Sequence, residues 1–181
     1  MPAYYIYLIS SLPMLNFFAR PPFSLEDFYN KCKNLISEKE FEILRSVCGQ
    51  DSYSLDIQGM NSLRQWTNFE TALRNELVRA RAGRKKIDPL KFLRFPDSPQ
   101  AEISHLAMIA YRSTSILEAE KVLDQGRWNF LEALSFGHYF DFDYLLIYGL
   151  KLKILERWEK IQKADKEHLL NSVIARKERS D

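Results

Sequence analysis

The last third of the chain, residues 115–161, constrains the fold most, because it carries two amphipathic stretches joined by a short hinge. The first opens with the sequence Ser115-Ile116-Leu117-Glu118, a capping box whose serine and glutamate satisfy free amides at a helix start. The second opens at Asp141, an acceptable N-cap, and repeats apolar residues at three- and four-residue steps. Residues 136–141, polar and aromatic, form the hinge. The pattern predicts two helices that pack on each other, one over about 115–137 and one from about 141 at least to 161.

Helix signals recur through the rest of the chain. Ser24 and Ser37 each precede an acidic turn, and the helix after Ser37 is expected to stop near Gly49. A long helix is predicted over about 60–83, ending at Gly83, and another over about 100–112. Residues 4–15 fit either a strand or a short helix. We predict an all-α fold, a multi-helix bundle of about six helices in one domain or two helical subdomains. The side chains expected to be mostly buried are Trp128, Phe130, Leu134, Tyr144, Ile147 and Ile154.

The best linker is residues 87–99, which hold three prolines. Its apolar residues Phe92, Leu93 and Phe95 indicate that it is pinned to a core. The predicted organisation is an N-terminal helical part over 1–86 with a hairpin and a long basic helix, the linker over 87–99, a C-terminal helical part over 100–165, and a polar tail over 166–181.

Composition excludes several classes of protein. The chain is 46% hydrophobic and 28% charged, which is typical of a globular protein. No apolar stretch is long enough to span a bilayer, and the N-terminal apolar run follows no basic region. Cys32 and Cys48 have neither C-x-x-C spacing nor matching histidines, so we expect two buried thiols in a reducing compartment. The predicted location is the cytoplasm, at most peripheral to a membrane.

Catalytic and metal motifs are weak in this sequence. Glu102 and His105 form one E-x-x-H pair, whereas a helical di-iron site uses two such pairs and further glutamates. Asp141 and Asp143 lie near His138, but helix capping already accounts for Asp141. The sequence contains no phosphate-binding glycine loop and no G-x-S-x-G motif. We therefore predict a protein that is not an enzyme and has no catalytic, cofactor-binding or metal-ligating residues.

The clearest charge feature is residues 74–94, which hold eight cations against Glu76 and Asp88. Such a stretch could meet an acidic protein, anionic lipid or nucleic acid, or it could be solvated charge at the negative end of a helix dipole. The stretch lacks exposed aromatics interleaved with its cations, which weakens the case for single-stranded nucleic acid. The candidate partner-binding residues are Arg74, Arg79, Arg81, Arg84, Lys85 and Lys86, together with His138, Tyr139 and Phe140 of the hinge.

Several blocks of the sequence carry a family resemblance. The most specific are residues 119–124, 127–131, 136–141 and 150–158; residues 4–5, 11–13 and 72–77 fit the same family. These blocks resemble a bacterial family of unknown function encoded among V-type (A-type) ATP synthase subunits. That family is in turn distantly similar to the C subunit (d in eukaryotes) of rotary ATPases, an all-helical cap that joins the rotor stalk to the membrane ring.

The resemblance implies a non-catalytic helical accessory or central-stalk-type component of a V/A-type rotary ATPase, with ATPase subunits as partners. Its role would be ion-transport coupling or assembly. A nucleic-acid-binding helical module is the alternative, and a helical metalloenzyme ranks third.

Overall fold

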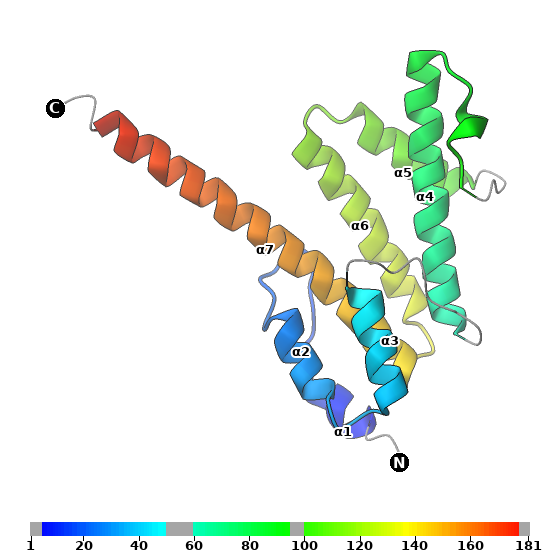
Figure 1. Cartoon of the computed structure of the whole chain (residues 1–181), viewed down its shortest axis with the longest axis vertical. Coiled ribbons are helices and arrows are strands. Elements are labelled where there is room, and N and C mark those ends of the chain that lie inside the picture. Colours follow the sequence, from blue (N-terminus) through cyan, green and yellow to red (C-terminus); the bar gives the residue numbers. More distant parts are fainter. Residues whose placement is uncertain (1–4, 50–59, 95–99, 178–181) are drawn as a thin grey trace. The chain divides into compact units, whose positions relative to one another are not determined.

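The computed structural model describes residues 5–49, 60–94 and 100–177, with side chains up to residue 164. Within these residues the fold is all-α, as predicted, and no strand occurs. The helices are α1 (Tyr5–Ser10), α2 (Leu25–Cys32), α3 (Glu38–Cys48), α4 (Asn61–Lys85), the 3-10 helix η1 (Pro89–Lys91), α5 (Ala101–Arg112), α6 (Ile116–Leu134) and α7 (Phe142–Lys177) (Figure 1). The sequence left a strand and a short helix open at the start of the chain, and residues 5–10 form a helix.

The chain divides into two compact units. The first comprises residues 1–50 and 148–181, and the second comprises residues 51–147. The Pro-containing segment 87–99 therefore lies inside the second unit. Helix α7 begins in the second unit and continues into the first.

Side-chain caps set the starts of α2, α3, α6 and α7, whereas α4 and α5 begin without one. The predicted N-caps Ser24 and Ser37 both form complete capping boxes, since each serine accepts from the amide three residues on and that residue's carboxylate accepts in return. Ser115 also caps its helix, accepting from the amide of Glu118 at 3.1 Å. The carboxylate of Glu118 accepts from the Thr114 hydroxyl at 2.7 Å. Asp141 accepts from the amide of Tyr144 at 3.0 Å, which confirms it as the N-cap of α7. These local signals explain why the helix starts were predictable.

The predicted end of the long helix at Gly83 is wrong. Helix α4 continues to Lys85, and Lys86 takes the left-handed conformation with a φ of 52°. The amide of Ile87 bonds the carbonyl of Ala82 at 3.2 Å, and the amide of Lys86 bonds that of Gly83 at 3.3 Å. This is the Schellman arrangement, which satisfies the terminal carbonyls with a lysine in the place that glycine usually takes.

In the first unit, Gly149 of α7 lies where α7 approaches its neighbours closely. A Cβ atom there would lie 2.7 Å from the Cys48 sulfur and 3.2 Å from the Phe28 ring. The side chains that this atom would meet, Phe28, Leu44 and Cys48, are buried. Both cysteines are free and buried, as predicted, and burial raises the pKa of each thiol to about 12.

In the second unit, an ionic network ties α4 to α6. The Arg127 guanidinium bonds Glu70 of α4 at 2.7 Å and Asp124 of its own helix at 2.8 Å. Asp124 is only 1% exposed. Arg74 approaches the same Glu70 at 3.9 Å. Arg127 therefore neutralises two carboxylates that come from different helices.

Of the six side chains predicted to be mostly buried, three are buried and three keep a minor part of their surface exposed. Trp128, Ile147 and Ile154 are buried, as predicted. The side chains that are only half-buried are Phe130, Leu134 and Tyr144. The Phe130 ring stacks on Phe69 of α4 with centroids 4.2 Å apart and 13° between the planes. Stacking covers one ring face, so Phe130 lies on the side of α6 that the spacing of apolar residues predicted, with part of its side chain still exposed.

Replacing Phe130 with alanine is expected to cost about 2 kcal/mol of unfolding free energy. Full enclosure of a phenylalanine would make the loss about 3–5 kcal/mol, and the stacked pair contributes about 0.5–1.5 kcal/mol of its own. Urea titration followed by circular dichroism measures the loss. The control is Phe136→Ala, whose ring is 86% exposed and whose loss should stay below about 0.5 kcal/mol. Equal losses for the two variants would contradict the stacked placement of Phe130.

Candidate partner-binding surface

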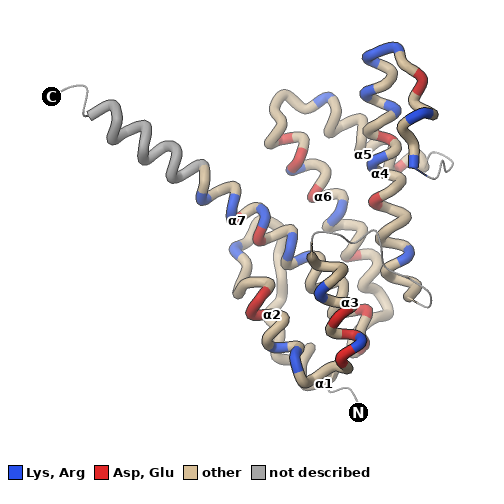
Figure 2. The backbone as a smooth tube through the Cα atoms, viewed as in Figure 1, with Lys and Arg blue, Asp and Glu red and all other residues tan. Residues whose placement is uncertain are grey.

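The densest basic surface lies on the last turns of α4 (Figure 2). Arg81, Arg84 and Lys85 are exposed there, and their spacing of three and four residues puts them on one face of the helix. Lys86 is exposed as well, at the left-handed cap. Cations in the last turn interact favourably with the negative end of the helix dipole, so these charges also stabilise the helix that carries them.

The six predicted cations of α4 do not form one uniform patch. Arg74 and Arg79 are half-buried and pair with Glu70 and Glu76 of the same helix. Burial lowers the pKa of Arg74, and the nearby charges of Arg94 and Arg127 lower it further. Arg74 and Arg79 thus serve the packing of α4, whereas the last-turn cations face solvent.

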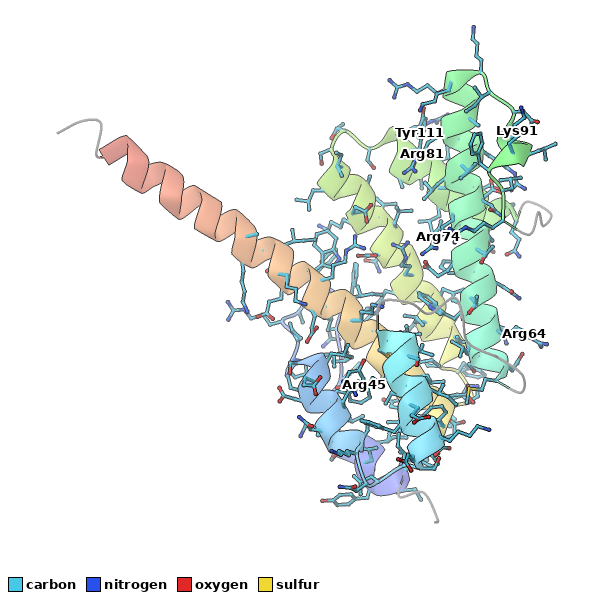
Figure 3. The ribbon with its side chains drawn as sticks, in the orientation of Figure 1. Arg45, Arg64, Arg74, Arg81, Lys91 and Tyr111 are labelled. Carbon is cyan, nitrogen blue, oxygen red and sulfur yellow. The ribbon has the colours of Figure 1, made fainter. Side chains whose placement is uncertain are left out.

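An apolar pocket of about 530 Å³ opens beside these cations, wholly within the second unit. Arg81, Arg84 and Lys85 are its basic lining residues. The rest of the lining comes from α4, the segment after it and α5, namely Val78, Ala82, Ile87, Phe92 and Tyr111. Figure 3 labels Arg81 and Tyr111 at this end of α4 and Arg64 at the other end. Pockets that bind ligands are typically apolar with a few placed polar groups, which is the composition seen here.

Asn75 positions the segment that follows α4. Its side-chain amide donates to the Arg94 carbonyl at 2.8 Å, and the Arg94 amide donates to its side-chain oxygen at 2.9 Å. Asn75 is 2% exposed, so this pair of bonds is well shielded. The prediction that aromatic residues pin the segment is wrong for Phe92, which is 58% exposed; Phe95 lies outside the described residues. The polar anchor at Asn75 leaves Phe92 free to line the pocket.

The hinge is a separate surface at the opposite end of α4. His138 is half-buried: its Nδ1 lies 2.6 Å from an Asp141 carboxylate oxygen and its Nε2 lies 3.3 Å from the Ser62 hydroxyl. Tyr139 and Phe140, also predicted to bind a partner, are exposed. Ser62 and Arg81 are separated by roughly 28 Å along the helix axis at 1.5 Å per residue. The hinge and the basic surface therefore cannot form one small-molecule site.

Three hinge residues could hold a cation. The ligand atoms of His138, Asp141 and Asp143 all lie within 4.8 Å of one another. Asp141 already engages the His138 ring and the amide of Tyr144, and these bonds account for its position. The other pair considered from sequence, Glu102 and His105, lies exposed on α5.

We expect the purified protein to carry no stoichiometric iron, manganese or zinc, because capping and the histidine contact account for the position of Asp141. Elemental analysis after dialysis without chelator measures the metal content. Stoichiometric metal that disappears in the His138→Ala variant would overturn this expectation and make the hinge a metal site. Metal that persists in that variant would also contradict it but would place the site elsewhere.

Comparison with known proteins yields one partial match. Residues 102–180, which span α5 to α7, match the model of a family described as a protein of unknown function (DUF2764). No curated protein and no solved structure matches the chain. The match agrees with the expected resemblance to a family of unknown function, and it includes the hinge and Tyr111 but not the α4 cations. Among the described residues, no helix combines the length and apolarity needed to cross a membrane.

Proposed function

We propose that this chain is a non-catalytic helical accessory or central-stalk-type component of a V/A-type rotary ATPase, acting in ion-transport coupling or in assembly. The observation that carries the proposal is the exposed basic face of Arg81, Arg84 and Lys85 beside an open apolar pocket. Such a surface combines an orienting field with an apolar area to bury, which are the two features of a protein docking surface. The resemblance to a family encoded with ATPase subunits supplies the identity of the partner.

The test is purification of the tagged chain from the organism that encodes it, with ATPase subunits identified by mass spectrometry after low-salt and high-salt washes. We expect ATPase subunits to be retained at low salt and lost as salt rises, because charge complementarity acts mainly on the encounter rate. Absence of every ATPase subunit at low salt would contradict the proposal. Presence of the chain in the washed, intact ATPase would favour a stalk component over a transient assembly factor.

The charge-reversed variant Arg81→Glu/Lys85→Glu/Lys86→Glu tests whether the basic surface does the docking. All three cations are exposed, so the fold should survive their reversal. ATPase capture by this variant should fall at low salt. Undiminished capture would make the hinge, at His138, Tyr139 and Phe140, the docking surface instead.

A nucleic-acid-binding module is the second candidate, and one observation favours it. The fold brings Phe92 and Tyr111 to the cations of α4. Phe92 lies within the basic stretch and is 58% exposed, so the expectation that this stretch lacks exposed aromatics is wrong. Aromatic rings beside cations are a feature of surfaces that bind single strands. Direct titration with single-stranded oligothymidine tests this candidate, which predicts affinity that falls steeply with salt.

A further inference from the structure

The pocket at the end of α4 has the dimensions of a binding site rather than of a packing defect. Its volume of about 530 Å³ is enough to enclose a large apolar side chain together with part of its backbone. It is open to solvent and lies within one compact unit, so no movement between units is needed to fill it. Ile87 and Phe92 remain 46% and 58% exposed beside it. Covering them would remove apolar surface from water.

The charges at the pocket indicate the sign and the spread of the ligand's charge. Arg81, Arg84 and Lys85 extend about 6 Å along one helix face, from the rise of 1.5 Å per residue. Among the residues that the structure describes, no acidic side chain lines the pocket. A ligand that carries a single carboxylate, such as a fatty acid, can approach only part of this row. A ligand with several carboxylates spread along its length can approach all three cations at once.

The apolar lining indicates what accompanies those carboxylates. Val78, Ala82 and Ile87 are aliphatic, so most of the apolar lining offers no flat ring to a nucleobase, and the rings present are those of Phe92 and Tyr111. They suit a leucine or phenylalanine side chain, because apolar side chains gain free energy by burial in proportion to the area covered. Phe92 and Tyr111 add amphipathic and aromatic area of the kind enriched at protein interfaces.

We propose that this pocket binds an acidic segment of a partner protein, which inserts one large apolar side chain between Ile87, Phe92 and Tyr111 while its flanking carboxylates contact Arg81, Arg84 and Lys85. The inference rests on the proposed function, since it names the chemistry of the partner at the same surface. The inserted side chain supplies the buried area, and the carboxylates supply orientation and a fast encounter.

The test uses the purified full chain and a short fluorescent peptide with glutamates around a central phenylalanine. Fluorescence anisotropy measures its affinity at low and at physiological salt. Companion probes are the same peptide with central alanine, a version with lysine for glutamate, single-stranded oligothymidine, and phosphatidylglycerol vesicles. We expect the acidic phenylalanine peptide to bind, the alanine peptide to bind at least about tenfold more weakly, and the lysine peptide not to bind.

Two matched pairs of variants locate the binding on the chain. Arg81→Glu should weaken binding of the acidic peptide about tenfold or more. Arg64→Glu makes an equal charge change at an exposed residue at the other end of α4, and its affinity for the peptide should stay within about twofold of the native value. Phe92→Ala should weaken binding of this peptide about threefold or more, while Leu90→Ala, an exposed residue of the same segment outside the pocket, should have no effect. Circular dichroism of the four variants checks that each retains its helices.

The outcomes distinguish the pocket assignment from a general charge effect and from the ATPase proposal. Equal loss in Arg81→Glu and Arg64→Glu would mean a general charge effect and would overturn the pocket assignment, as would tighter binding of oligothymidine or vesicles than of the peptide. Peptide binding at the pocket without any ATPase capture would leave the pocket assignment intact and reject the ATPase. ATPase capture without peptide binding would leave the ATPase assignment intact and reject the pocket as the site of an acidic segment.

Discussion

Replacing Gly149 with leucine is expected to unfold the first unit. A Cβ at this position would already lie 2.7 Å from the Cys48 sulfur, so even alanine forces the neighbouring helices to shift. Leucine adds three further carbons among Phe28, Leu44 and Cys48, which are buried and have no space to yield. Overpacking of this kind typically costs 1–3 kcal/mol for small insertions, and we expect about 3 kcal/mol or more here.

Thiol reactivity measures this effect in the first unit alone, because both cysteines belong to it. In the native chain, burial and the raised pKa of about 12 should make Cys32 and Cys48 slow to react with dithionitrobenzoate at pH 8. In Gly149→Leu both thiols should react rapidly. The matched control is Gly83→Ala on α4, where nothing lies within 4 Å of the added carbon. That change should leave the thiols protected and stabilise the helix by up to about 1 kcal/mol. Protected thiols in Gly149→Leu would show that the helices are not in close contact there.

Local patterns account for the part of the fold that sequence could predict. A cap needs a serine or aspartate and an amide three residues away, so Ser24, Ser37, Ser115 and Asp141 were visible in the sequence. Apolar periodicity likewise predicted which face of α6 and which face of α7 is buried. The helix end at Lys86 was missed because left-handed backbone at a lysine has no sequence signature comparable to glycine.

The candidate site depended on contacts that span the sequence. The pocket joins Ile87 and Phe92 to Tyr111 of another helix, and no spacing rule connects these residues. The anchor at Asn75 was also missed, although an asparagine inside a long helix is a poor helix former and a hint of a specific role. The pairing of Arg74 and Arg79 could be predicted from the sequence, since Glu70 and Glu76 precede them at helical pairing distance. What distinguishes these arginines from the exposed ones is burial, which appears only once the helices pack.

Replacing Arg127 with alanine is expected to destabilise the second unit by about 3–5 kcal/mol, the loss typical of removing one partner from a buried ion pair. Burial alone lowers the pKa of the Arg127 guanidinium, but Glu70 and Asp124 outweigh that effect and raise it overall. The charged form is therefore the one that the fold favours. Without the Arg127 guanidinium, the Asp124 carboxylate stays buried beside the Glu70 carboxylate of α4. Neither carboxylate can be hydrated without opening the contact between α4 and α6.

Urea titration followed by circular dichroism measures the Arg127 effect, with Arg64→Ala as the matched control. Arg64 is exposed at the start of α4, so its loss should change the unfolding free energy by less than about 0.5 kcal/mol. Arg127→Lys should fall between the two, because an ammonium keeps the charge but cannot direct donors toward Glu70 and Asp124 together as the planar guanidinium does. A double-mutant cycle with Glu70→Gln should show coupling above about 0.5 kcal/mol. A loss in Arg127→Ala no greater than in Arg64→Ala would mean that the packing of α4 on α6 does not depend on this network.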